Sequence, residues 1–153
     1  MLSVAHTLDR FDQGGSQETF VQIRLPRHKS ARKLMAFWLT RPNDSVLIGR
    51  DIPSNEIAPL FGNLTVWEPV GDGQDYVLRH MGDTLRMRLS LHFPAGRLMS
   101  ELLSPEFYAY HRSNFPTLAK AEDIEVLDVL QGLSGSNCRH FEVVTFAAQA
   151  PHT

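Results

Sequence analysis

The alternation of apolar and polar residues predicts two β-hairpins in this chain. Residues 64–70 and 75–81 are rich in the β-branched and aromatic side chains that strands favour. An Asp-Gly pair between them tolerates the positive φ of a tight turn. Residues 124–130 and 140–148 alternate in the same way and are separated by glycine, serine and asparagine, which predicts the second hairpin.

A helix is predicted ahead of the first hairpin. Apolar side chains recur there at the spacing of one helical face, and Ser30 and Pro42 are the expected cap and stop signals. The residues on this face are Ala31, Leu34, Met35 and Trp38, and the neighbouring Phe37 and Leu39 widen it. The excess of apolar surface predicts that this helix packs deeply or meets a second chain.

Two short helices and one longer helix are predicted between the hairpins. Asp83 is a suitable cap for the first, residues 94–96 break it, and residues 97–103 form the second. The Ser-Pro-Glu sequence at residues 104–106 combines a cap, a first-turn proline and an acid that matches the helix dipole. It opens the longer helix, which Pro116 is expected to end or kink.

This order of elements predicts an α+β domain with an antiparallel sheet, helices packed on one face and a preceding N-terminal helix. At 153 residues the chain has the length of one domain with an extension. We assign the domain to residues 31–148 and expect a flexible segment in residues 1–18, an extra strand and connector in residues 19–30, and a tail in residues 149–153.

Composition and charge exclude several classes of protein. Apolar residues make up 42% and charged residues 21%, which is ordinary for a folded domain and unlike a disordered chain. No run approaches the roughly 20 apolar residues of a membrane span, and the N-terminus lacks a secretory pattern. We therefore expect a cytoplasmic protein without membrane insertion. The single cysteine, Cys138, excludes an internal disulfide.

Basic residues are concentrated near the N-terminus, although the net charge is −2. Residues 19–43 contain no acid, and their cations are Arg24, Arg27, Lys29, Arg32, Lys33 and Arg41. The overall balance and the lack of interleaved aromatic residues argue against a nucleic-acid partner. This segment is interpreted as a solvated helix start or as a surface for an acidic protein partner.

Short motifs spread over residues 31–148 suggest a family. They are Phe37-Trp38, Asp51-Ile52-Pro53, Tyr76-Val77-Leu78-Arg79, Gly82-Asp83-Thr84-Leu85 and Ala95-Gly96-Arg97. In this order they resemble the PAS domain superfamily, and more narrowly a short bacterial family in which the domain is nearly the whole protein. The resemblance implies a non-catalytic sensor or interaction module in signal transduction, without shared catalytic residues.

The resemblance also implies a fifth strand after the second hairpin, and the sequence has no strand pattern there. A PAS sheet has five strands, and the last in sequence lies between the first and the fourth. Only residues 149–153 follow the second hairpin here. Residues 20–25 alternate like a strand, with Val21, Ile23 and Leu25 on one side, so we expect them to pair within a sheet and fill the empty place. The rival expectation is a differently wound domain.

The resemblance and the strand patterns predict a small apolar ligand between sheet and helices. The expected lining residues are Leu64, Val66, Leu78, His80, Leu85, Leu89, Phe107, His111 and Phe146. Some PAS domains bind haem through a histidine on the long helix, where His111 falls, so haem is a further candidate. A homodimer is expected through Leu34, Phe37 and Trp38.

An enzyme is the alternative interpretation. A small cone-shaped isomerase or hydratase needs a histidine and an aspartate in an apolar pocket. The candidates are His80 or His111 with Asp51 or Asp83. Cys138 is two residues from His140, but the thiol is better explained as an incidental turn residue.

Overall fold

The computed structural model describes residues 3–4, 10–13, 19–52, 54–89, 94–132 and 137–149, with the backbone alone for residues 3–4, 10–13, 88–89, 131–132 and 137–139. Its elements are β1 (Ser3–Val4), β2 (Arg10–Gln13), β3 (Thr19–Gln22), α1 (Lys29–Leu39), the 3-10 helix η1 (Ala58–Asn63), β4 (Thr65–Val70), β5 (Asp75–Met81), α2 (Asp83–Leu89), α3 (Met99–Leu102), α4 (Pro105–Ala121), β6 (Ile124–Gly132) and β7 (Asn137–Ala148). Both predicted hairpins and the α+β class are confirmed.

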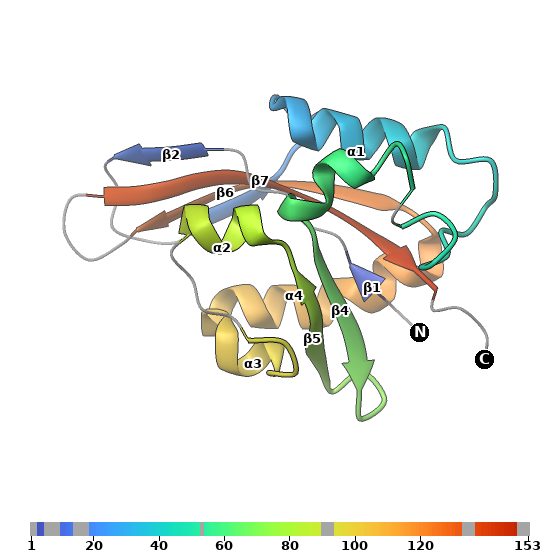
Figure 1. The fold of residues 1–153 in the computed structure, drawn as a ribbon. Coiled ribbons are helices and arrows are strands. Elements are labelled where there is room, and N and C mark those ends of the chain that lie inside the picture. Colours follow the sequence, from blue (N-terminus) through green and yellow to red (C-terminus); the bar gives the residue numbers. More distant parts are fainter. Residues whose placement is uncertain are drawn as a thin grey trace.

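The long antiparallel hairpin of β6 and β7 is the centre of the main sheet (Figure 1). Its register pairs Ile124 with Phe146 and Gly132 with Cys138. β3 pairs with β6 on one side, and β1 and β2 pair with β7 on the other. All these ladders are antiparallel, and the outer ones supply backbone partners for residues 127–130 of β6 and for residues 137–140 and 147–148 of β7.

Residues 20–25 were expected to pair within a sheet, and the pairing is confirmed for β3. Its place in the sheet differs from the expected central one. β3 pairs with β6 at the end of the strand order, with Phe20 opposite Val129. β1 pairs with β7 and contacts β4, while β4 and β5 form a separate two-stranded sheet. Within residues 1–18, which were expected to be a flexible segment, residues 3–4 and 10–13 form short strands that pair with the two ends of β7.

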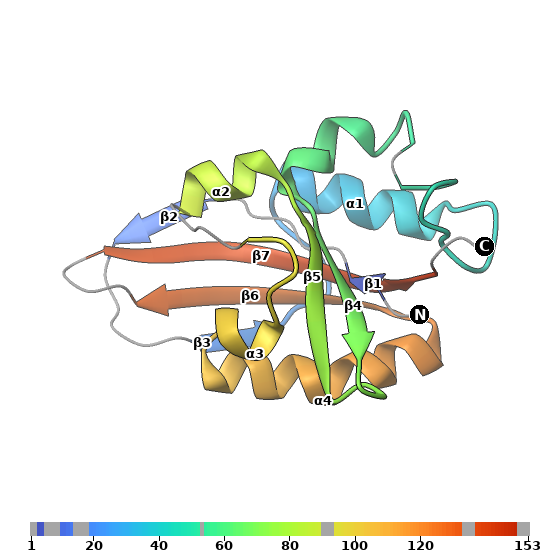
Figure 2. The ribbon, with the colours of Figure 1, turned by 60° about the horizontal axis from the view of Figure 1, so that its bottom comes forward.

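The hairpin of β4 and β5 runs steeply across the direction of β6 and β7 (Figure 2). Its turn has positive φ at Gly71 (57°), Asp72 (58°) and Gly73 (82°). This is the backbone region that glycine and aspartate tolerate best, so the Asp-Gly signal correctly located the turn.

Helices cover both faces of the β6–β7 hairpin, so the prediction of helices on one face is wrong. On one face, Leu127 and Val143 pack with Phe107 and Phe115 of α4 in what we call the α4-side core. On the other face, Val126, Val144 and Phe146 pack with Ala31, Leu34 and Phe37 of α1 in the α1-side core. Because alternate strand residues are apolar on both faces, each face needs its own cover.

The cap of α1 differs from the prediction, and Pro116 does not end its helix. The N-cap of α1 is His28, not Ser30, and its side chain makes no capping hydrogen bond. Pro116 lies inside α4, which continues to Ala121. Burial of Phe115 and Leu118 on either side of the proline holds this helix against the sheet and offsets the lost hydrogen bond. The Ser104 cap is confirmed, since its Oγ accepts the Phe107 N–H at 3.2 Å.

None of the helices in the described part of the chain combines the length and apolar character that crossing a bilayer requires.

Candidate functional site

The structure divides the expected ligand-lining residues between different environments. Leu78, Leu85 and Phe107 lie in the α4-side core, whereas Leu64 and Phe146 lie in the α1-side core. Val66 is half-buried opposite His80, and the side chain of Leu89 lies outside the described residues. These residues therefore do not surround one common cavity.

His111 lies on the predicted face of α4 and is completely buried. Its ring centroid is 4.2 Å from that of Phe107, 4.8 Å from that of Phe115 and 5.8 Å from that of Tyr110. The His111 ring is therefore packed among three aromatic rings, as a core residue is.

The expected dimer residues are mostly used within the protomer. Leu34 and Phe37 are buried in the α1-side core, so they offer no surface to a second chain. Trp38 is half-buried, and the Arg41 guanidinium lies 3.9 Å from its ring centroid. Burial within one chain thus accounts for most of the apolar surface of α1.

The residues proposed for an enzyme have other partners. His80 Nε2 lies 3.3 Å from the carbonyl oxygen of Phe61, and its ring stacks on that of Phe61. Asp51 accepts hydrogen bonds from the Arg50 guanidinium and from the Leu47 N–H, and the Arg50 contact above all lowers the pKa of this carboxyl. Asp83 is on the exposed first turn of α2. The side chain of Cys138 lies outside the described residues.

Two buried carboxylates missed by the sequence analysis stand on opposite faces of the β6–β7 hairpin. Glu125 shares its face with Leu127 and Val129, and Glu142 shares the other with Val144 and Phe146. Their exposed fractions are only 4% and 1%. A single acid within an apolar row of period two was the available signal, because such a position directs the carboxylate into the core.

Glu142 is bound by the backbone at the start of α1. The Arg27 N–H lies 2.9 Å from both carboxylate oxygens, and the His28 N–H donates to Oε1 at 2.9 Å. Because His28 is the N-cap of α1, this carboxylate binds the N–H of the cap residue and of the residue before it, and it complements the positive end of the helix dipole. Its geometry is that of a structural anchor.

An ion-pair cluster adjoins this anchor. His140 Nε2 lies 2.6 Å from Asp128 Oδ1, and Arg27 Nη2 lies 2.9 Å from Asp128 Oδ2. Asp128 and Glu142 are opposite each other across the ladder. The structure therefore forms a His–Asp pair, but from residues other than those predicted.

Glu125 is bound by side chains only, and at one of its two oxygens. Its Oε2 accepts hydrogen bonds from the Tyr110 hydroxyl, from Asn114 Nδ2, and from Gln22 Nε2 at 2.9 Å. Its Oε1 is buried and accepts no hydrogen bond from the part of the chain that the structure describes. Thr145, directly opposite on β7, also has a buried hydroxyl without a partner among those residues.

A pocket of about 270 Å³ lies beside this carboxylate, between β3, β6 and α4. Its described lining residues combine polar and apolar side chains: Gln22, Ile23, Asn114, Thr117, Leu118, Ala121, Asp123, Ile124, Glu125 and Val126. An unpartnered carboxylate oxygen is costly in a protein interior. Because Glu125, the residue that carries this oxygen, also lines the pocket, we take it as the candidate site and call it the Glu125 pocket.

The surroundings of Glu125 also affect Tyr110. Burial raises the pKa of the Tyr110 hydroxyl far above its usual value, and the hydrogen bond to Glu125 raises it further. Tyr110 therefore stays protonated at neutral pH and acts as a hydrogen-bond donor to the carboxylate.

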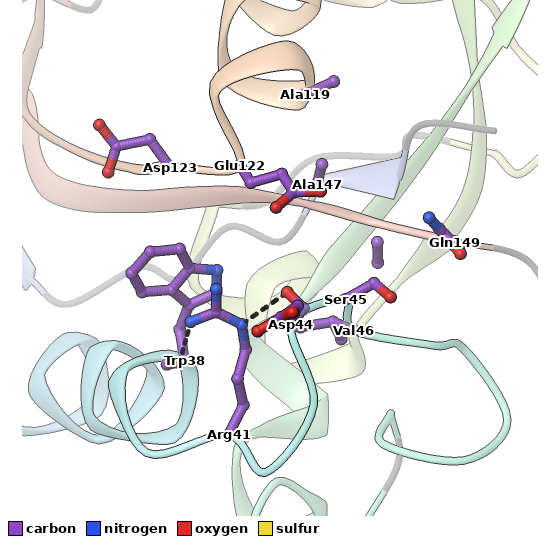
Figure 3. A pocket seen from close by; sticks show the side chains of 11 residues that line it. Trp38, Arg41, Asp44, Ser45, Val46, Ala119, Glu122, Asp123, Ala147 and Gln149 are labelled. Atoms are coloured by element: carbon purple, nitrogen blue, oxygen red, sulfur yellow. Dashed lines mark hydrogen bonds between the residues drawn. The ribbon is translucent and has the colours of Figure 1, made fainter.

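A second, smaller pocket of about 130 Å³ lies between the C-terminal ends of α1 and α4 (Figure 3). Arg41 is held there by its own helix end, since Nη1 donates to the Trp38 carbonyl oxygen at 2.6 Å and Nε to that of Asp44 at 3.0 Å. Asp123 lines both pockets and points away from Trp38 and Arg41 in this view. The arginine closes the end of α1, so this pocket is better explained as structural.

No group of three or more potential metal ligands is present among the residues that the structure describes. Comparisons with protein-family models, with curated proteins and with solved structures find no match for this chain.

Proposed function

We propose that this chain is a non-catalytic PAS-like regulatory module that binds a small molecule in the Glu125 pocket and acts through a protein partner in bacterial signalling. The order of elements supports the PAS assignment, with a hairpin, short helices, a long helix and a second hairpin. The pairing of β1 with β7 and its contact with β4 add to this support, because the central strand of a PAS sheet lies next to the corresponding two strands.

The observation that carries the proposal is the unused oxygen of Glu125. A carboxylate that is 4% exposed has three donors at Oε2 and none at Oε1 among the described residues. Sites that bind small molecules present a few unsatisfied polar groups on an apolar surface. The pocket has this character, with Leu118, Ile124 and Val126 beside the carboxylate.

Gln22 gives this pocket a direct connection to the proposed partner surface. Its side chain contacts Glu125, while its backbone is part of β3 at the end of the strand order. Val21 and Leu25 are 62% and 69% exposed beside this edge. Exposed cations follow on the same segment and on α1, namely Arg24, Lys29 and Lys33. An acidic partner strand adding to β3 fits this surface.

Native mass spectrometry of the full chain tests the proposal. We expect an additional small-molecule mass that is lost on denaturation. Ala121→Phe fills the pocket from an exposed position of α4 and should remove this mass. Ala36→Phe, on the exposed side of α1, is the matched control and should retain it. Two results together would contradict the proposal. The first is a native mass spectrum without an additional mass, and the second is an unfolding temperature that no added class of compound raises.

The His140–Asp128 pair favours an enzyme as the second candidate. A histidine oriented by an aspartate is a common general base. However, Asp128 also binds Arg27, and neither residue lines the Glu125 pocket. Turnover in a broad panel of isomerase and hydratase substrates, abolished by His140→Ala and retained in Ala36→Phe, would favour this candidate instead.

A further inference from the structure

We propose that the ligand of the Glu125 pocket is a small organic cation, a primary ammonium group on a short aliphatic chain. This inference rests on the proposed function and specifies its ligand. It follows from three features of the pocket: the polar atoms that remain available, the signs of the charges, and the apolar surface beside them.

The polar atoms left in the pocket are mainly hydrogen-bond acceptors. The amide nitrogens of Gln22 and Asn114 both donate to Glu125, which leaves their carbonyl oxygens as acceptors. The carboxylate of Asp123 and the Thr117 hydroxyl also accept. Glu125 lines the same pocket, and its Oε1 is buried without a donor among the described residues. A ligand that matches this set must donate several hydrogen bonds, as a primary ammonium does.

The charges in the pocket have one sign. Glu125 and Asp123 are acidic, and no lysine or arginine is among its described lining residues. The three groups bound to Glu125 Oε2 are neutral, because Tyr110 remains protonated. A buried carboxylate without a cation is costly, so a positive ligand gains both a charge-assisted hydrogen bond and an ion pair.

Size and apolar surface define the remainder of the ligand. The volume of about 270 Å³ is slightly below the 300–1,000 Å³ of typical drug-sized sites. Leu118, Ile124 and Val126 provide apolar contacts beside the carboxylate. A short alkyl chain covers this surface, whereas a bare metal ion would leave it in contact with water.

Titration with n-propylammonium chloride at constant ionic strength tests the inference. The readout is the NMR shift of the side-chain amide groups of Gln22 and Asn114, which contact Glu125. Propan-1-ol and sodium propionate are probes of similar shape with neutral and negative charge. We expect the cation to bind at least tenfold more tightly than either. Constant ionic strength separates this difference from general screening.

Three variants locate the effect. Glu125→Gln keeps the shape of the side chain and should weaken n-propylammonium binding at least tenfold. Glu122→Gln removes the same charge from an exposed neighbour outside the Glu125 pocket and should change binding less than twofold. Ala121→Phe fills the pocket without changing charge and should abolish binding, so the conclusion does not depend on one variant folding correctly.

The outcomes separate this inference from the proposed function. Equal or tighter binding of propan-1-ol or propionate at the same amides overturns the cationic ligand but leaves a small-molecule site. Equal binding of the cation to Glu125→Gln overturns the role of this carboxylate. If no probe shifts these amides, the ammonium ligand is excluded, and the mass measurement on the full chain decides independently whether the protein retains a ligand.

Discussion

Glu142 and Glu125 are both buried glutamates of the β6–β7 hairpin, but their surroundings differ in kind. Backbone N–H groups at the start of α1 donate to both oxygens of Glu142. Side chains from β3 and α4 donate to one oxygen of Glu125. Its other oxygen is buried without a partner among the described residues, and the residue lines a pocket. Burial alone therefore does not identify a functional carboxylate.

The difference between the two sites concerns which groups can respond to a ligand. Backbone donors at a helix start are fixed by the helix, so Glu142 has a single stable arrangement. The side chains of Gln22, Asn114 and Tyr110 have rotatable bonds and can rearrange around Glu125. A binding site needs a spare acceptor and adjustable neighbours, and of these two carboxylates only Glu125 combines both.

The largest expected effect comes from a chain that begins at Pro26. It lacks β1 and β3, which pair with β7 and β6. It also loses the hydrogen bond of Gln22 to Glu125 and the packing of Phe20 against Phe107 and Tyr110. We expect the free energy of unfolding to fall by about 4 kcal/mol or more, measured in urea. A chain beginning at Thr19 keeps β3 and should recover part of the loss; an unchanged transition in both would show that these strands contribute nothing.

Glu142→Gln is expected to have the next largest effect. The new amide NH₂ replaces an oxygen that accepts a backbone N–H, so one donor faces another. We expect a loss of about 2–3 kcal/mol in the free energy of unfolding, measured in urea. A loss below about 1 kcal/mol would contradict the role of Glu142 as an anchor of α1.

Tyr110→Phe tests one donor of the Glu125 cluster while keeping the ring contacts with Phe20 and His111. We expect a loss of about 1–2 kcal/mol at neutral pH, since one hydrogen bond to a charged group disappears. Folding raises the pKa of Tyr110, so its contribution is complete below pH about 10, the ordinary pKa of tyrosine, and declines as pH rises further. Urea unfolding between pH 8 and pH 11 should show a weaker alkaline decline in the variant; identical declines would contradict this account.

Glu125→Gln should have the smallest effect on stability and so sharpens the comparison with the same substitution at Glu142. The amide oxygen can keep the three hydrogen bonds at the Oε2 position, and the NH₂ takes the place of an oxygen that has no donor. We expect a change below about 1 kcal/mol in urea unfolding. A loss equal to that of Glu142→Gln would remove the distinction between the two sites.

Only part of the candidate site was predictable from the sequence. Glu125 stands in a row with Leu127 and Val129, so its burial follows from strand alternation alone. Its donors come from residues 22, 110 and 114, which are remote in sequence, and helical or strand periodicity does not specify which remote side chains meet. The prediction of one apolar pocket was wrong for a related reason. Periodicity does not reveal that Leu64 and Phe107 belong to cores on different faces of the sheet.

The sequence by itself determined the elements whose signals are local. The Asp-Gly turn, the Ser104 cap and the alternation of β6 and β7 each depend on residues a few positions apart, and local preferences suffice where no distant contact competes. Pro116 shows the limit of this rule, because the packing of Phe115 and Leu118 maintains α4 across a helix-breaking residue.

Only the tertiary structure decided how these elements are joined. Residues 3–4 and 10–13 form strands because the open edge of β7 needs hydrogen-bond partners, and β3 lies beside β6 because Phe20 and Gln22 find contacts on α4 and Glu125 there. α1 covers the second face because Val144 and Phe146 are apolar on that side. Such pairings satisfy backbone groups and bury side chains over long sequence separations, and their energies depend on the complete fold rather than on any local pattern.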